Sequence, residues 1–293
     1  MMRLVNRYEE LAHGEIKRIA DDWRLSVYPK VRVADVVSLD DAGATGELKR
    51  YGLQSHFDFV VCQDQWDPIY AIEFDGKYHS TPVQKQRDTK KDELCRRADF
   101  PILRINSRYL TGEFGSMSLL AWIMDVCAMQ EEFYGLQEQG SVPPDEVFDP
   151  FFLMSAEEGQ SEFKYWFSAK PRIRMQQQSK QGRILDPVTS GLIGYDDEGV
   201  LRGIEFIRVT NEEAVIVRTA MRPQQFPIVL SELLGEILCV QLEQKVARWM
   251  KTGVGAQPTS MIWTEIETMR RDLKIASSHS YGPSCGTTPS QGP

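Results

Sequence analysis

The chain has 293 residues, of which 42% are hydrophobic and 26% are charged. This composition excludes a wholly disordered protein, and the length favours two domains over one. A formal net charge of -8 and a pI near 5.2 argue against a protein that coats nucleic acid with its whole surface, because such binding depends on clustered Lys and Arg.

The amino-terminal stretch lacks the apolar segment of a secretory signal, and the chain has no run of about eighteen apolar residues that would cross a membrane. We therefore expect a cytoplasmic protein without membrane contact. The five cysteines are far apart and include no CxxC pair, which favours reduced thiols over a zinc site or a disulfide framework.

The first elements are predicted from periodicity. Apolar residues at helical spacing predict an amphipathic helix over residues 4–23. Residues 27–37 alternate in character and are rich in valine, which predicts a strand, with Pro29 placing its start at an edge or a bulge. Residues 40–52 are predicted as a polar loop.

Two short apolar strands, residues 56–63 and 69–76, flank a turn-forming stretch and are predicted to form a hairpin. Residues 83–98 follow as a charged helix, residues 100–106 as a buried strand and residues 116–134 as a further helix. The order of helix, strand, hairpin, helix and strand predicts an α/β domain with a mixed sheet flanked by helices.

The second half begins after residues 135–150, a stretch of Gly, Pro and acids that is predicted as a linker. Residues 184–220 predict a small antiparallel meander, and residues 228–250 and 260–274 predict two helices. The predicted organisation is a first domain, a linker, a second, smaller α+β domain and a disordered tail, over residues 1–134, 135–150, 151–275 and 276–293.

Acidic side chains gather in the predicted hairpin. Glu73, Asp75 and Lys77 are two residues apart, so in an extended strand they share one face. Asp58 lies on the neighbouring strand, roughly opposite Glu73, where the Cβ atoms of cross-strand neighbours are about 5 Å apart. Three carboxylates are therefore expected to crowd one end of the sheet.

Like charges held together in this way need a compensating cation. Ligands that are all oxygens suit Mg²⁺ or Mn²⁺ better than zinc, and Mg²⁺ is commonly held by one or two carboxylates with water and substrate phosphate. We therefore expect Asp58, Glu73 and Asp75 to bind this metal, which would activate water against a phosphodiester. Lys77 is expected to hold the attacking water or to offset charge on the phosphorane.

The residues that surround this cluster resemble the PD-(D/E)XK nuclease superfamily. Within it, the chain is most similar to uncharacterised bacterial domains related to very-short-patch-repair endonucleases, over residues of about 5–110. The motif has an acid in a D-F pair, then E-x-D-G-x-x-H, then D-x-x-K and a closing strand. Its matches here are Asp58, then Glu73, Asp75, Gly76 and His79, then Asp88 and Lys91, and then Leu103, Arg104 and Ile105.

This resemblance implies a restriction-endonuclease-like core, in which a mixed four-stranded sheet lies between two helices. It also implies phosphodiester hydrolysis, most simply of DNA, with Asp58 and Glu73 as metal ligands. The sequence departs from the usual motif, because Asp75 stands two residues after Glu73, where most of the superfamily has lysine. The lysine role therefore falls to Lys77 in a shifted register or to Lys91 on the following helix.

Other residues are assigned supporting roles. His79 would orient the substrate or shuttle a proton, and Glu9 or Glu10 of the first helix would supply an additional acid. Residues 78–109 carry eight basic and four acidic residues, which would grip the flanking phosphates. A simpler interpretation is that the basic residues form the solvated face of a helix and that Asp75 and Gly76 form an ordinary turn.

Two other functions are compatible with the sequence. One is a nuclease-fold module that binds nucleic acid or a protein partner but no longer cuts, and the other is a subunit that is dormant until a partner arrives. The second half is assigned no chemistry; it is expected to select the target, to form a homodimer or to dock on another protein.

Overall fold

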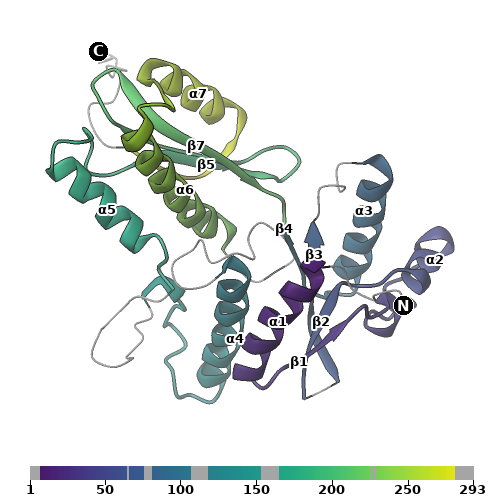
Figure 1. Ribbon diagram of the computed structural model, residues 1–293. Coiled ribbons are helices and arrows are strands. Elements are labelled where there is room, and N and C mark those ends of the chain that lie inside the picture. The colour runs from purple at the N-terminus through teal and green to yellow at the C-terminus, as the bar shows by residue number, and fades with distance from the viewer. Residues whose placement is uncertain are drawn as a thin grey trace, which may run out of the picture. The chain divides into compact units, whose positions relative to one another are not determined.

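The computed structural model describes residues 7–64, 66–75, 81–106, 118–152, 165–224, 226 and 229–280. The chain divides into two compact units (Figure 1). The first comprises Met1–Pro150 together with Gln224–Ile228, and the second comprises Phe151–Pro223 together with Val229–Pro293.

The first unit contains a four-stranded sheet in the order β1-β2-β3-β4. β1, β2 and β3 are antiparallel, whereas β4 runs parallel to β3, so the sheet is mixed as predicted. Its elements are α1 (Arg7–Asp22), β1 (Ser26–Pro29), η1 (Val33–Asp35), α2 (Gly46–Gln54), β2 (Phe59–Gln63), β3 (Asp67–Asp75), α3 (Pro82–Arg97), β4 (Ile102–Asn106) and α4 (Leu119–Glu138).

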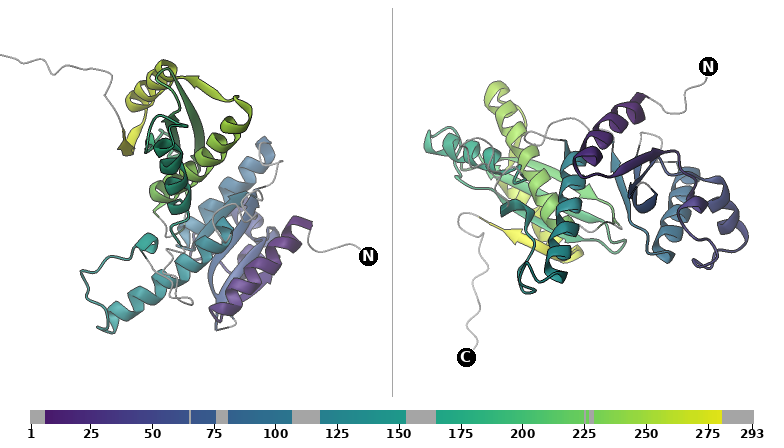
Figure 2. Two further views of the ribbon diagram at one scale, coloured as in Figure 1. Left: turned by 60° about the vertical axis from the view of Figure 1, so that its left-hand side comes forward. Right: turned by 90° about the horizontal axis from the view of Figure 1, so that it is seen from below.

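Helices cover both faces of this sheet, because alternate residues of each strand point to opposite sides. On one face, Val60 and Ala71 pack with Leu94 and Cys95 of α3 in a single buried cluster. On the other face, the ring of Phe59 stacks on His13 of α1. α1 packs along α4 on this side, and Figure 2 shows the two helices next to each other. The prediction of an α/β unit with a mixed sheet flanked by helices is therefore confirmed.

Two predictions for this unit are wrong. The strand predicted over residues 27–37 ends at Pro29, because Lys30 adopts a left-handed conformation with φ of 55° that breaks the extended run. The loop predicted over residues 40–52 contains α2, which starts after Thr45 and buries Gly52 against Leu39. The stretch is mostly polar, and the apolar stripe by which α2 packs against the core is too short to stand out in the sequence.

The second unit contains a five-stranded antiparallel sheet in the order β8-β7-β6-β5-β9. Its strands are β5 (Ser190–Tyr195), β6 (Leu201–Arg208), β7 (Glu213–Met221), β8 (Ala256–Pro258) and β9 (Lys274–His279). Its helices are α5 (Ala169–Lys180), α6 (Leu230–Thr252) and α7 (Thr259–Asp272), and the short η3 (Pro150–Phe152) precedes them. Buried residues of α6 pack on one face of the sheet, and Ile262 and Ile266 of α7 pack on the other.

The predicted meander and the two carboxy-terminal helices are confirmed by β5 to β7, α6 and α7. The helix α5 lay outside the predicted elements. The tail predicted to begin at residue 276 is wrong in part, because β9 extends through His279 and pairs with β5. All six residues of β9 are exposed, so the strand is held by its backbone hydrogen bonds rather than by buried side chains. Such a strand leaves no hydrophobic pattern in the sequence. Residues 281–293 of the predicted tail lie outside the described residues.

The helices in the described part of the chain are all too short or too polar to cross a bilayer. Cys62, Cys95, Cys127 and Cys239 are buried free thiols, and Cys285 lies outside the described residues.

Candidate functional site

Three charged residues occupy the same level on neighbouring strands. The antiparallel register pairs Phe59 of β2 with Ile72 of β3, so the next pair outward is Asp58 with Glu73. The parallel register pairs Glu73 with Arg104 of β4. Because side chains alternate along a strand, Glu73 and Arg104 share the face of Ala71, which packs against α3. The carboxylates of Asp58 and Glu73 and the guanidinium of Arg104 thus lie in a row across neighbouring strands, on the face of the sheet that α3 covers.

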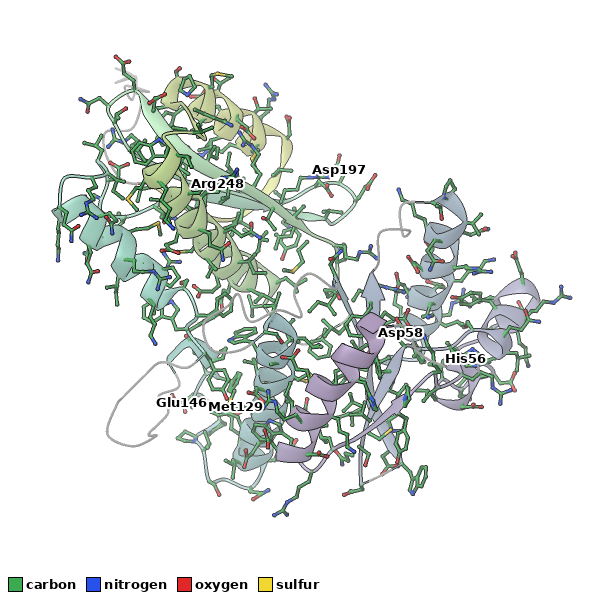
Figure 3. The ribbon with its side chains drawn as sticks, in the orientation of Figure 1. His56, Asp58, Met129, Glu146, Asp197 and Arg248 are labelled. Atoms are coloured by element: carbon green, nitrogen blue, oxygen red, sulfur yellow. The ribbon has the colours of Figure 1, made fainter. Side chains whose placement is uncertain are left out.

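Asp58 and Glu73 are linked through their backbone and carboxylate groups. The backbone N–H of Asp58 donates to Oε1 of Glu73 at 3.2 Å, and the backbone N–H of Phe74 donates to Oδ2 of Asp58 at 2.9 Å. Figure 3 shows Asp58 at the start of β2, close to His56. Each carboxylate is therefore bonded to the backbone of the neighbouring strand, at the end of the hairpin that faces away from its turn.

Lys91 enters the site from α3. Its Nζ donates to Oε1 of Glu73 at 2.7 Å and to the backbone carbonyl of His56 at 2.8 Å, and it lies 5.4 Å from the centre of the Phe57 ring. The side chains of Lys91 and Glu73 are only 8% and 7% exposed. Lys91 reaches the sheet because Lys91, Leu94 and Cys95 share the face of α3 that the sheet covers.

Arg104 joins the acids of α3 to the sheet. Its Nε and Nη2 donate to Oδ1 of Asp92 at 2.8 Å and 2.7 Å. Its Nη1 lies 3.7 Å from Glu73 and 3.6 Å from Asp88, distances of ion pairs rather than of hydrogen bonds. The side-chain amide of Gln224 holds the backbone of Arg104 with two hydrogen bonds, which satisfies part of the edge of β4.

Lys30 is a site residue that the sequence analysis missed. Its Nζ donates to Oδ1 of Asp58 at 2.7 Å, and its backbone N–H donates to the carbonyl of Asp58 at 3.0 Å. The left-handed backbone of Lys30 is costly for a residue with a side chain, and such conformations concentrate at functional sites. The pairing of β1 with β2 brings Pro29 opposite Phe59, so an alignment of the two strands would have found Lys30 opposite Asp58.

The electrostatics of the site follow from burial. The cluster holds four carboxylates, of Asp58, Glu73, Asp88 and Asp92, and three cations, of Lys30, Lys91 and Arg104. Burial raises the pKa of Glu73 above its ordinary value, although Lys91 and Arg104 act in the opposite direction. Buried acids with shifted pKa values and specific charge partners occur at active sites and also in structural ion-pair networks.

The predicted site residues divide into two groups. The structure brings together Asp58, Glu73 and Lys91, and places Asp75 at the end of β3. The side chains of Asp75, Glu9 and Glu10 are not among those described, and Lys77 and His79 lie outside the described residues, as does Gly76. Among described side chains, no group of three or more His, Cys, Asp or Glu is arranged to hold a metal.

Most of the basic residues of segment 78–109, which were predicted to grip phosphates, form ion pairs within the chain. Lys90 pairs with Glu47, and Arg96 and Arg97 both pair with Glu93. The remaining basic residues are Lys91 and Arg104 in the buried cluster, Arg108 outside the described residues, and Lys85 and Arg87 on the exposed side of α3. Lys85 and Arg87 make no ion pair with any described residue, so they are the cations of α3 available to a phosphate.

Comparison with known proteins gives one match. The family model described as "Protein of unknown function (DUF2726)" matches residues 1–114, which include Asp58, Glu73, Lys91 and Arg104. No curated protein and no solved structure matches the chain. The buried charge cluster thus lies wholly in the part of the chain that is similar to this family.

Proposed function

We propose that this chain is a metal-dependent endonuclease that hydrolyses phosphodiester bonds, with DNA as its substrate. The observation that carries the proposal is the convergence of Asp58 and Glu73, from adjacent strands, with the buried ammonium of Lys91 on Glu73. The resemblance of the same residues to the PD-(D/E)XK motif supports it, and Lys91 takes the lysine role in this arrangement.

The donor chemistry of the site fits Mg²⁺ or Mn²⁺. Asp58 and Glu73 offer carboxylate oxygens from adjacent strands, and a magnesium site needs only one or two carboxylates beside water and phosphate. Asp75, at the end of the same strand as Glu73, is a third proposed ligand. When bound, the metal would supply Lewis-acid activation of water and of the phosphodiester.

The chain's own residues would then orient the reaction. Lys91 fixes the carboxylate of Glu73 and offers its one remaining N–H donor to the attacking water or to a phosphorane oxygen. Lys77 and His79 keep supporting roles in the proposal, for charge and proton transfer. Lys85 and Arg87, on the exposed side of α3, would contact phosphates that flank the cleaved bond.

A second candidate function is a nuclease-fold subunit that binds nucleic acid or a partner protein without cutting. It is favoured by the observation that each acid already has its own lysine, Lys30 on Asp58 and Lys91 on Glu73, both at 2.7 Å. Such pairs compensate both carboxylates without a metal, as in a structural ion-pair network.

A cleavage assay separates the two functions. The purified full chain is incubated with Mg²⁺ or Mn²⁺ and with supercoiled, linear and single-stranded DNA. We expect Asp58→Asn and Glu73→Gln to lower the cleavage rate at least about 100-fold, because each removes charge needed in the transition state. Asp67→Asn, an exposed acid at the far end of β3, is the matched control and should cut normally. Equal cutting by all four proteins would reveal a contaminant, and binding of DNA without cutting would favour the second function.

A further inference from the structure

The first unit has a cavity of about 360 Å³ on the face of the sheet opposite Glu73. Tyr70 of β3 lines it, and since Tyr70 and Glu73 are three residues apart on one strand, they point to opposite faces. This volume lies within the range of about 300–1,000 Å³ that is usual for sites of small molecules. The cavity is therefore separate from the acidic cluster.

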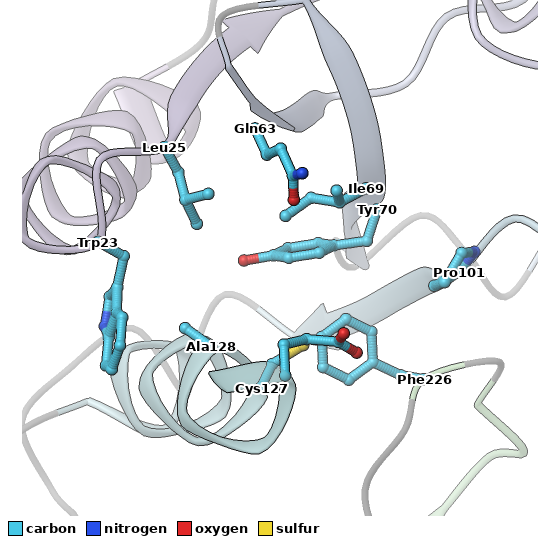
Figure 4. Close-up of a pocket in the computed structure, with 10 residues that line it drawn as sticks. Trp23, Leu25, Gln63, Ile69, Tyr70, Pro101, Cys127, Ala128 and Phe226 are labelled. Atoms are coloured by element: carbon cyan, nitrogen blue, oxygen red, sulfur yellow. The ribbon is translucent and has the colours of Figure 1, made fainter. Parts of the chain in front are cut away.

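The walls of the cavity are aromatic and held in place. The indole Nε1 of Trp23 donates to Oδ1 of Asp125 on α4 at 3.0 Å. The ring of Phe226 meets that of Tyr70 edge to face, with centroids 5.2 Å apart. Figure 4 shows Trp23 at one end of the cavity and Phe226 near the other, with Tyr70 between them. The rings thus form a preorganised space for a flat ligand.

Three polar side chains that line this cavity are available to a ligand. The side chains of Tyr70, Gln63 and Glu131 make no hydrogen bond or ion pair with any other part of the chain that the structure describes. Tyr70 is only 3% exposed, yet its hydroxyl points into the space between Leu25 and Ala128 in Figure 4. The Tyr70 hydroxyl therefore faces the cavity, where it is available to form a hydrogen bond with a ligand.

The chemistry of these groups defines the ligand. Glu131 accepts hydrogen bonds only, whereas Tyr70 and Gln63 both donate and accept. A matching ligand is flat, carries at least one N–H donor and also presents acceptors. Among the described residues, no Lys or Arg lines the cavity, so a phosphate or carboxylate on the ligand would meet Glu131 without a compensating cation from this part of the chain.

We propose that this cavity binds an amino-substituted heteroaromatic ring, such as an aminopurine or aminopyrimidine nucleobase, in the absence of a phosphate. The ring lies between the aromatic walls, its amino group donates to Glu131, and its ring acceptors receive the Tyr70 hydroxyl and the Gln63 amide. This site is independent of the proposed nuclease activity, because it uses none of the residues of the acidic cluster.

The test is calorimetric titration of the full chain with adenosine, inosine and adenosine monophosphate. Inosine is the matched control ligand, since it replaces the amino group of adenosine by a carbonyl. We expect adenosine to bind about tenfold more tightly than inosine, the size of one lost buried hydrogen bond, and the monophosphate to bind more weakly than adenosine.

Four variants locate the binding. Tyr70→Phe removes only the hydroxyl and should weaken adenosine binding about tenfold. Glu131→Gln should reduce the preference for adenosine over inosine, and Ala128→Leu should weaken binding by occupying part of the cavity. Glu132→Gln, next along α4 but outside the cavity, should have no effect. The proposal is overturned if none of the three compounds binds saturably, if inosine equals adenosine, or if Ala128→Leu leaves binding unchanged.

Discussion

The ammonium of Lys91 donates to the carboxylate of Glu73 at 2.7 Å, with both side chains almost completely buried. The pair joins α3 to the centre of the sheet, between β2 on one side and β4 on the other. A buried pair of this kind is costly to desolvate, so a stable apolar pair would serve the fold equally well. Its presence at the level of Asp58 and Arg104 therefore favours a chemical role.

Removal of the Lys91 ammonium should destabilise the fold strongly. Lys91→Met keeps an unbranched apolar side chain but leaves the buried Glu73 carboxylate without its closest cation, and we expect a loss of about 3 kcal/mol or more in unfolding free energy. Lys90→Met, which breaks the exposed pair with Glu47, should cost about 1 kcal/mol or less. Urea denaturation followed by circular dichroism measures both, and equal costs would show that Lys91 is not in a buried pair.

Lys30 should compete with a divalent cation for Asp58. Lys30→Met removes a positive charge 2.7 Å from Oδ1 of Asp58, and we expect the affinity for Mn²⁺ to rise about tenfold, because two nearby cations repel by a few kcal/mol at most near a surface. Lys49→Met, which breaks a surface pair with Asp40, is the control and should not change the affinity. Weaker Mn²⁺ binding by Lys30→Met would instead mean that Lys30 orients Asp58 for the metal.

Glu205 in the second unit should make stability depend on pH. Burial raises the pKa of Glu205 from its ordinary value of 4.5 to about 7. The folded state then binds a proton more tightly than the unfolded chain, so the contribution of Glu205 to stability is present below pH 4.5 and is lost as the pH rises to about 7.

The comparison with Glu205→Gln isolates this effect. Relative to the native chain, the variant should gain about 3 kcal/mol in unfolding free energy between those two pH values, as expected for a shift of this size. Glu212 lies in an exposed turn between β6 and β7, so the unfolding free energy of Glu212→Gln should change with pH in the same way as that of the native protein. Parallel curves for Glu205→Gln as well would show that Glu205 titrates normally in the folded state.

The central part of the fold follows from local patterns in the sequence. The alternation on both sides of the turn after Gln63 predicts the hairpin. A β-bulge between the pairs of Cys62 and Val61 then shifts the register by one residue, and this shift brings residue 58 opposite residue 73. The amphipathic pattern of α3 places Lys91 among Leu94 and Cys95, which is a signal that this lysine faces the sheet.

The remaining site contacts depend on tertiary pairing. Lys30 reaches Asp58 only because β1 pairs with β2, and Gln224 reaches Arg104 across 120 residues of sequence. Whether Lys77 or Lys91 takes the place of the motif lysine also depends on packing, because Lys77 follows β3 in the sequence whereas Lys91 lies on α3. Two further elements were not predicted because they leave little hydrophobic periodicity in the sequence. β9 is held by backbone pairing, and α2 has only a short apolar stripe.

The most direct test of whether Asp58 and Glu73 together bind a divalent metal ion is a titration with Mn²⁺ monitored by electron paramagnetic resonance, which distinguishes free from bound metal. The full chain is compared with Asp58→Asn, Glu73→Gln and the control Asp67→Asn. We predict that the native chain and Asp67→Asn each bind Mn²⁺ at a saturable site, and that this site is lost when either residue of the acidic pair is neutralised. Undiminished Mn²⁺ binding by Asp58→Asn and Glu73→Gln would contradict a metal held between β2 and β3.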